Sequence, residues 1–209
     1  ENHILQSLTK ETFSKNVVYV SDAGMPCVSD PGASLVEFCI QNEIAYDVLP
    51  GANAILTAYA MSGFSHTTFS FYGFLDHKGV SRASKLNDAL NDAKLAILYE
   101  SPHRLLKLLE ELSIKDANRT IFLAKEISKL HQNSYKDTAL NLFEKFKDIN
   151  IKGEWVVIIE PKETVGFNLD LDDILSLDIA PKIKAKLIAK MTGQSIKEVY
   201  QQILDRIPE

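Results

Sequence analysis

A twelve-residue loop rich in Gly, Pro and Asp constrains this chain more than any other feature. This Asp-Gly loop (residues 21–32) reads Ser-Asp-Ala-Gly-Met-Pro-Cys-Val-Ser-Asp-Pro-Gly, follows an apolar run at 17–20 and precedes a helix-like run at 33–42. A connector in an α/β protein usually needs about 2–6 residues. Ligands of such proteins bind at the carboxyl ends of strands, where backbone N–H groups and helix N-termini are available. The loop therefore predicts a small-ligand site in an α/β fold.

Strand-like and helix-like runs alternate through the first three-quarters of the chain, which is typical of a parallel sheet with crossover helices. After a break near residues 63–67 the alternation resumes. We expect two α/β domains, residues 1–64 and 65–161, with a ligand cleft between them. The expected strands are 17–20, 46–49, 68–72, 95–99, 120–124 and 155–160, and the expected helices are 33–42, 52–62, 81–93, 102–111 and 139–147.

The sequence changes character after Pro161, so residues 162–209 are expected to form a linker and a helical tail. Residues 162–173 are polar and acidic, and 180–206 has a helical pattern. Within it, Ala189, Gly193 and Val199 are spaced as in a helix-turn-helix. The tail lysines predict contact with RNA phosphates, or else form the solvated face of a small helical cap. The RNA-binding candidates are Lys182, Lys186, Lys190 and Lys197.

Composition favours an ordinary globular protein, with 45% hydrophobic and 24% charged residues. The net charge of −5 gives the whole molecule no general attraction for nucleic acid. No apolar stretch approaches the roughly 20 residues that span a bilayer, and the five histidines lack metal-ligand spacing. Two cysteines, Cys27 and Cys39, fit a reducing cytosol. We therefore expect a cytoplasmic protein without a membrane segment or a metal.

The Asp-Gly loop closely resembles the corresponding loop of the ribosomal RNA small subunit methyltransferase I family, a branch of the tetrapyrrole methylase superfamily. The resemblance implies a two-domain α/β fold, S-adenosylmethionine as cofactor and 2′-O-methylation of a cytidine in 16S ribosomal RNA. It further implies a bacterial homodimer that acts on the small ribosomal subunit. Similar blocks follow in the same order at 49–54, 72–75, 99–104, 124–129 and 152–154.

The chain departs from the family pattern at its start. Members of the family begin with a strand and a Pro-Ile-Gly-Asn turn that form the first wall of the cofactor cleft. No such block precedes residue 17 here. We therefore expect the first βα unit of the N-terminal domain to be absent from this chain.

Two turns between strands and helices are the expected cofactor contacts: the Asp-Gly loop and a Pro-Gly turn at residues 50–54. Asp22 is expected to face the ligand, whereas Asp30 is favoured as a cap of the following helix. The resemblance implies that the loop contacts the cofactor mainly through its backbone. Without the resemblance, the Pro-Gly turn reads as a routine helix start. The cofactor-binding candidates are Ser21, Asp22, Ala23, Gly24, Asp30, Pro50, Gly51, Ala52, Ala54 and Thr57.

Charged residues at the ends of predicted strands are the candidates for the acceptor side of the site. Methyl transfer requires aligned reactants, and a ribose hydroxyl also needs a base. These residues either form an ion-pair network or hold the acceptor, with Lys129 or a carboxylate as base. Lys125 and Lys129 either contact phosphate or are solvated. The catalytic candidates, without assigned roles, are Glu100, Arg104, Glu126, Lys129 and Glu154.

Two other functions are compatible with the sequence. The first is a tetrapyrrole methylase acting on a small corrin precursor, which has no need of a basic helical tail. The second is a noncatalytic RNA-binding or assembly factor that keeps the fold. The hydrogen-bonding groups of the Asp-Gly loop favour the enzyme over this second alternative.

Overall fold

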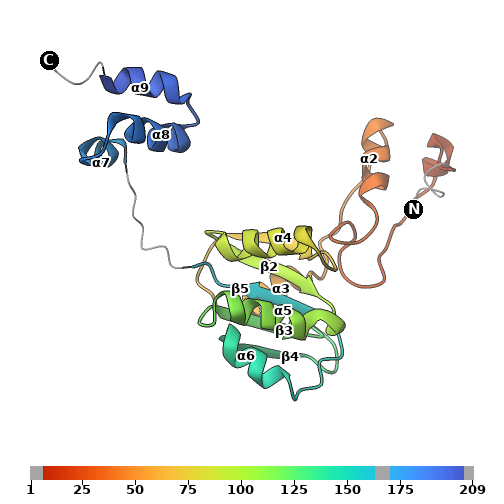
Figure 1. The fold of residues 1–209 in the computed structure, drawn as a ribbon. Coiled ribbons are helices and arrows are strands. Elements are labelled where there is room, and N and C mark those ends of the chain that lie inside the picture. The colour runs from red at the N-terminus through yellow and green to blue at the C-terminus, as the bar shows by residue number, and fades with distance from the viewer. Residues whose placement is uncertain (1–6, 163–169, 205–209) are drawn as a thin grey trace. The chain divides into compact units, whose positions relative to one another are not determined.

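The chain divides into two compact units, residues 1–162 and 163–209 (Figure 1). The computed structural model describes residues 7–162 and 170–204. Each unit has a hydrophobic core of its own. No helix in the described part of the chain is long and apolar enough to cross a membrane. A domain boundary between residues 64 and 65 stays a prediction.

A five-stranded sheet with the order β1-β2-β5-β3-β4 forms the centre of the first unit. The α/β class is confirmed, but the sheet is mixed rather than parallel. β1 and β2 run parallel, whereas β5 is antiparallel to both β2 and β3, and β4 is antiparallel to β3. The short β3–β4 connection is compatible only with antiparallel neighbours, because a parallel pair needs a long crossover. The strands are β1 Phe69–Phe74, β2 Leu95–Glu100, β3 Thr120–Lys125, β4 Asn133–Thr138 and β5 Trp155–Ile159.

Helices cover both faces of this sheet (Figure 1). Side chains of a strand alternate between faces, so Val157 and Ile159 of β5 pack beneath three helices while Val156 and Ile158 pack against a fourth. The result is a three-layer arrangement that fixes the strand ends. The first face carries α4 Val80–Asn91, α5 Pro102–Lys115 and α6 Ala139–Phe146, and the second carries α3 Ala54–Ser62.

Helix α5 is anchored by a stripe of leucines. Leu105, Leu108, Leu109 and Leu112 recur at the three- and four-residue spacing of one helix face, and all are fully buried. Each contributes roughly 1.5–3 kcal/mol of burial free energy. The first turn begins at Pro102, where no intrahelical N–H bond is lost. This anchoring fixes the polar residues of the first turn of α5 against the end of β2.

Two strands expected in the N-terminal part do not form. Residues 17–20 and 46–49 are not in strands, and Val18 and Leu49 are 82% and 78% exposed. Apolar runs become strands only where a neighbouring strand pairs with their backbone, and no described strand lies beside these two. The expected helices do form there, as α2 Ala33–Gln41 and α3. A 3-10 helix, Lys10–Ser14, precedes them, and Phe13 stacks on Phe38 of α2 at 6.0 Å.

The second unit consists of three short helices in its described part: α7 Leu171–Ser176, α8 Pro181–Thr192 and α9 Ile196–Leu204. α7 begins inside the expected linker, where Asp170 and Asp173 form a capping box. Ala189 and Val199 are buried between the helices, and Gly193 ends α8 with φ +74°. The expected helix-turn-helix spacing therefore corresponds to real packing. Residues 205–206 of the expected helical run lie outside the described residues.

Candidate active site

The ends of β2 and β3 and the start of β5 meet at one edge of the sheet. Glu100 and Lys125 both register with Trp155, the first residue of β5. Glu126 follows β3 and Glu154 precedes β5, so both lie at the same edge. The structure therefore brings the carboxylates expected on the acceptor side to one edge of the sheet.

The Asp-Gly loop closes on the Pro-Gly turn. The Met25 N–H donates to the Ala52 carbonyl oxygen at 2.9 Å, and the Ser21 hydroxyl donates to the Gly24 carbonyl oxygen at 2.7 Å. Gly24 has φ +81°, and a Cβ at this position would lie 3.2 Å from the Ala52 oxygen. Only glycine combines this φ with so close an approach. Together with the exposed Ala23, the two segments form a cradle of backbone and small side chains.

The carboxylates of Asp22 and Asp30 are exposed, and neither has a hydrogen-bond or ion-pair partner among the residues that the structure describes. The expected capping role of Asp30 is wrong. The side chain that caps a helix usually belongs to the N-cap residue. The N-cap of α2 is Gly32, which has no side chain, and no side-chain hydrogen bond caps this helix. Both carboxylates are thus available to a ligand.

The Pro-Gly turn leads into a helix that is capped by its own residues. Asn53 Oδ1 accepts a backbone N–H of α3 at 3.1 Å, and the Thr57 hydroxyl donates to the Asn53 carbonyl at 2.8 Å. Ala54 packs against the core. Thr57 is therefore engaged within its helix, and the open part of the turn is Pro50, Gly51 and Ala52.

Tyr99 connects the Asp-Gly loop with the strand edge. Its ring lies 5.1 Å from the ring of Phe71 and 5.5 Å from that of Phe74. Burial raises the pKa of Tyr99, and the negative charges of Asp30 and Glu154 raise it further. The carboxylate of Asp30 in the loop and that of Glu154 at the strand edge therefore both influence the pKa of the Tyr99 hydroxyl. Sequence reasoning placed Tyr99 in a family block but gave it no role.

Glu126, Lys129 and Glu154 form a polar cluster, the acceptor cluster, at the ends of β3 and β5. Lys129 Nζ lies 3.2 Å from Glu126 Oε1 and 2.8 Å from Glu154 Oε2. Glu126 Oε1 also accepts the Glu154 N–H at 2.8 Å. This backbone hydrogen bond, followed by Lys129, lowers the pKa of Glu126, and the hydrogen bond to Glu154, followed by that to Glu126, raises the pKa of Lys129. At neutral pH the cluster holds a carboxylate and an ammonium, so Lys129 is not a neutral base.

Backbone geometry fixes the acceptor cluster. Glu126 and Ser128 have φ of 48° and 64°, in the left-handed region. Gly153 has φ +114°, and a Cβ there would lie 2.7 Å from Glu126 Cγ. Left-handed residues other than glycine cost roughly 1–3 kcal/mol each and persist where the surroundings hold them. The close approach at Gly153 is what allows the Glu126 carboxylate to reach the Glu154 N–H.

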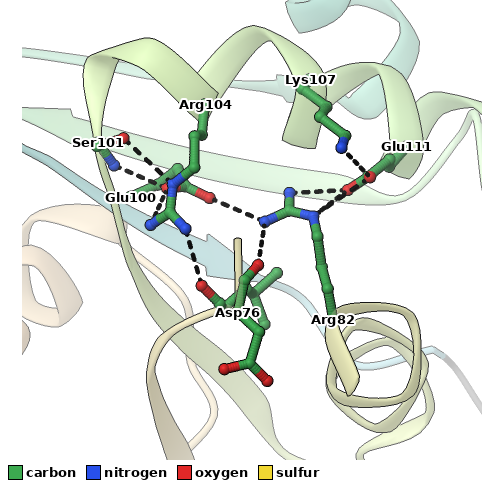
Figure 2. A network of polar contacts seen from close by, with 8 residues as sticks. Asp76, Arg82, Glu100, Ser101, Arg104, Lys107 and Glu111 are labelled. Carbon is green, nitrogen blue, oxygen red and sulfur yellow. Dashed lines mark hydrogen bonds and ion pairs between the residues drawn. The ribbon is translucent and has the colours of Figure 1, made fainter. Parts of the chain in front are cut away.

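Glu100 belongs to a separate, buried network (Figure 2). Its side chain is fully buried, and its Oε1 lies 2.8 Å from a guanidinium nitrogen of Arg104. Arg82 of α4 lies 3.7 Å from Glu100 Oε2 and 2.8 Å from Glu111 of α5. Sequence reasoning missed Arg82 and Glu111, because only packing of the two helices brings them to Glu100. The five catalytic candidates thus fall into two groups, and no ion pair joins the groups within the described residues.

The two arginines of this network, buried Arg82 and partly buried Arg104, hold the chain that follows β1. Arg104 donates to the Leu75 carbonyl oxygen at 2.9 Å, and Arg82 donates to the Asp76 carbonyl oxygen at 3.2 Å (Figure 2). A buried charge is costly unless it is paired and hydrogen-bonded, and these bonds add to the ion pairs that Arg82 and Arg104 make with Glu111 and Glu100. The network therefore positions the chain at the strand edge instead of opening to a ligand.

The lysines of the second unit lie on two helices. Lys182, Lys186 and Lys190 are exposed and recur every fourth residue, so they share one face of α8, and Lys197 is exposed on α9. Lys184 is different, because its ammonium donates to the Leu175 carbonyl at 2.6 Å. The four candidates therefore carry free positive charge at the surface of this unit.

The cradle fits a small organic cofactor. At Gly24 no side chain would keep a ligand away from the backbone. The carboxylates of Asp22 and Asp30, which have no partner among the described residues, can accept hydrogen bonds from hydroxyl or amino groups. In residues 7–162 and 170–204, no group of three or more His, Cys, Asp or Glu side chains is arranged to hold a metal ion.

Comparisons with known proteins identify the family. Residues 1–142 match the family described as Tetrapyrrole (Corrin/Porphyrin) Methylases. Two relatives named Ribosomal RNA small subunit methyltransferase I come from Campylobacter fetus subsp. fetus and Helicobacter pylori (strain ATCC 700392 / 26695). The first is 44% identical over 91% of this chain and 71% of its own length, and the second 40% identical over 98% and 73%. These matches confirm the resemblance inferred from the sequence.

Solved structures support the fold assignment. The crystal structure of the methyltransferase CobJ matches 79% of this chain and 72% of its own, with a TM-score of 0.54 and 22% identity, which shows likeness of fold alone. The family match and the relatives cover most of the described strand edge and both segments of the cradle. The chain therefore belongs to the tetrapyrrole methylase family, in the branch of the ribosomal RNA small subunit methyltransferase I proteins.

Proposed function

We propose that this chain transfers a methyl group from S-adenosylmethionine to the 2′-hydroxyl of a cytidine in 16S ribosomal RNA. As a member of its family the chain is an S-adenosylmethionine-dependent methyltransferase. The observation that carries the RNA assignment is the identity of 40–44% with proteins named for ribosomal RNA methylation, over more than nine-tenths of the chain. When bound, S-adenosylmethionine supplies a methyl group activated by its own sulfonium charge, so the protein's task is alignment.

The cradle would hold the cofactor. The backbone of Ala23 and Gly24 and the open Pro-Gly turn offer surface without bulky side chains. Asp22 and Asp30 would accept hydrogen bonds from the cofactor, because their carboxylates have no partner in the described residues. Thr57 contributes less than the sequence suggested, since its hydroxyl is bonded to Asn53.

The acceptor cluster would receive the ribose. Glu154 is the carboxylate assigned to take the 2′-hydroxyl proton, because its side chain is 81% exposed and Lys129 holds its Oε2 at 2.8 Å. Lys129 stays protonated and orients the base, and Glu126 fixes Lys129. Glu100 and Arg104 are positioning residues in this proposal, because Glu100 is buried and both hold the strand edge.

The same proposal covers the partners. The small ribosomal subunit presents the RNA, and the free lysines of α8 and α9 would contact its phosphates. A homodimer and a cytoplasmic location complete the proposal; both rest on the family resemblance. A noncatalytic assembly factor would bind the same RNA without methyl transfer.

The cofactor role of Asp22 can be tested by calorimetry. Replacing it by Asn, which keeps the shape but removes the charge, is expected to weaken S-adenosylmethionine binding about tenfold, since hydrogen bonds to charged groups contribute about 1.5–3 kcal/mol. Asp148→Asn is the matched control, because Asp148 is also exposed and lies outside the cradle. Equal affinity of Asp22→Asn and the parent chain would remove Asp22 from the site.

The reaction itself is tested with tritiated S-adenosylmethionine and small ribosomal subunits that lack the methyl group. Nuclease digestion should place the label in 2′-O-methylcytidine. Label in a base would contradict the ribose assignment. Cofactor binding without RNA labelling would favour a small tetrapyrrole acceptor or an assembly factor.

A further inference from the structure

A pocket of about 580 Å³ whose wall consists of charged and carboxamide residues, His131 and Gly153 lies beside the acceptor cluster. Its walls are the connection between β3 and β4 and the connection between α6 and β5. Glu126 and Gly153 belong both to the pocket wall and to the contact that fixes the acceptor cluster. A ligand in the pocket would therefore touch Glu126, which is bonded to Lys129 and to the Glu154 N–H.

The polar side-chain groups in the pocket wall are mainly hydrogen-bond donors. Three carboxamides have their oxygen atoms occupied: Gln132 accepts the Ser128 N–H at 2.6 Å, Asn133 that of Ser134 at 2.8 Å, and Asn150 that of Lys152 at 3.1 Å. Each oxygen thus already accepts one hydrogen bond, which orients the amide NH₂ group as the donor end of the side chain. No described residue accepts from these three NH₂ groups.

Two lysines add positive charge to these donors. Lys125 Nζ donates to the Asn150 carbonyl at 3.2 Å and lies 5.6 Å from the centre of the Trp155 ring, which leaves further N–H groups for a ligand. The side chains of Lys152 and His131 are exposed and have no polar partner within the described residues. The carboxylate of Glu126 is already engaged by Lys129 and the Glu154 N–H. The pocket thus presents cations and donors with its acid neutralised, which is the chemistry that binds phosphate oxygens.

We propose that this pocket, the phosphate pocket, binds the sugar-phosphate backbone of a single-stranded RNA segment next to the nucleotide that is methylated. The inference rests on the proposed RNA substrate and deepens it by naming where the strand is held. The pocket is larger than a single phosphate group requires. Lys125 and Lys152 alone could bind one phosphate, so the remaining donors are available to a longer segment of the backbone. A strand fixed here sets the position of the neighbouring ribose at the acceptor cluster.

Charge-neutral variants test the proposal through RNA binding. Lys152→Gln and the double variant Lys125→Gln/Lys152→Gln are compared with Lys94→Gln, because Lys94 is exposed and precedes β2 at the opposite edge of the sheet. Filter binding of a short single-stranded RNA containing the target cytidine is measured between about 50 and 200 mM salt, where each lost phosphate contact lowers the slope of log K against log salt by about 0.7.

We expect about tenfold weaker RNA binding and a reduced slope in the double variant, a smaller change in Lys152→Gln, and no change in Lys94→Gln. Affinity for S-adenosylmethionine should be the same in all three. Unchanged slopes in the pocket variants would overturn the proposal, as would an equal loss in Lys94→Gln. Competition by inorganic phosphate as effective as that by RNA would reduce the pocket to a small-anion site and also overturn it.

The two proposals fail in distinguishable ways. Methylation of RNA by the parent chain, with pocket variants that bind RNA normally, would reject the phosphate pocket alone. A parent chain that binds S-adenosylmethionine but neither binds nor methylates RNA would reject the proposed function, and the phosphate pocket with it.

Discussion

Gly153 sits where the backbone before β5 passes against the side chain of Glu126. The contact leaves no room for a Cβ, which would meet Glu126 Cγ at 2.7 Å. The same approach brings the Glu154 N–H to the Glu126 carboxylate and so arranges the acceptor cluster. The absence of a Cβ at Gly153 thus allows the arrangement of the three side chains of the acceptor cluster.

Replacing Gly153 by Ala is expected to lower the free energy of unfolding by about 3 kcal/mol, from the clash and the unfavourable φ together. The control is Gly63→Ala, because Gly63 also has a positive φ of +62° but nothing within 4 Å of its added Cβ. That variant should cost about 1–2 kcal/mol. Urea unfolding measures both, and equal losses would show that the contact with Glu126 is unimportant.

At this scale the sequence predicted some residues well and missed others for physical reasons. The charged candidates at the strand ends lie at one edge of the sheet, but they form two separate groups, because Glu100 pairs with Arg104 whereas Glu126 and Glu154 pair with Lys129. Asp30 was wrongly expected to cap α2, since turn residues cap only from the N-cap position itself. Arg82 carried no local signal, because its role depends on packing with Glu111.

Some helices and strands were easier to predict from the sequence than others. The helices and buried strands of the first unit have strong apolar patterns, and their positions agree with prediction within a few residues. β4 was missed, because Asn133–Thr138 is a polar, mostly exposed edge strand whose pairing with β3 is its main support. The runs at 17–20 and 46–49 show the reverse case, an apolar pattern without a strand beside it.

A hydrogen bond between β1 and the residue that follows α4 is expected to depend strongly on pH. The Tyr72 hydroxyl donates to Asp92 at 2.9 Å. Burial, followed by the hydrogen bond to Asp92, raises the pKa of Tyr72 from 10.0 to about 12. The unfolded chain therefore loses this proton first, so the stabilisation is complete below pH 10 and is lost between about pH 10 and pH 12.

Tyr72→Phe tests this link between β1 and α4. At pH 8 the variant should be less stable than the parent by about 1 kcal/mol, the net contribution of one hydrogen bond. That difference should shrink as the pH rises from about 10 toward 12. Urea unfolding of the variant and the parent across this pH range gives the difference in their free energies of unfolding. The titration of other groups cancels in that difference. A constant difference would contradict the assigned pKa.

The whole molecule separates its proposed tasks between two units. The first carries the cradle, the acceptor cluster and the phosphate pocket, and the second carries exposed lysines on α8 and α9 over a core of its own. In a chain of net charge −5, RNA attraction has to come from such local groups.

Reversing charge at Lys186 and Lys190 in the full chain should weaken binding to small ribosomal subunits and flatten its salt dependence. Affinity for S-adenosylmethionine should not change, since both lysines belong to the second unit. The control is Lys184→Gln, which removes a lysine that is bonded to the Leu175 carbonyl instead of being free. An unaltered salt dependence after charge reversal would make the tail a structural cap.

The buried position of Trp155 makes the intrinsic fluorescence of this chain selective. It is the sole tryptophan, only 2% of its surface is exposed, and it packs against Phe146 and Tyr135 beneath Lys125 of the phosphate pocket. Tryptophan fluorescence therefore reports on the first unit and its pocket wall. It does not report on the second unit, which contains no tryptophan. Of these two methods, circular dichroism detects the helices of both units, whereas tryptophan fluorescence follows the first unit. Comparing the two melting curves therefore separates the unfolding of one unit from that of the other.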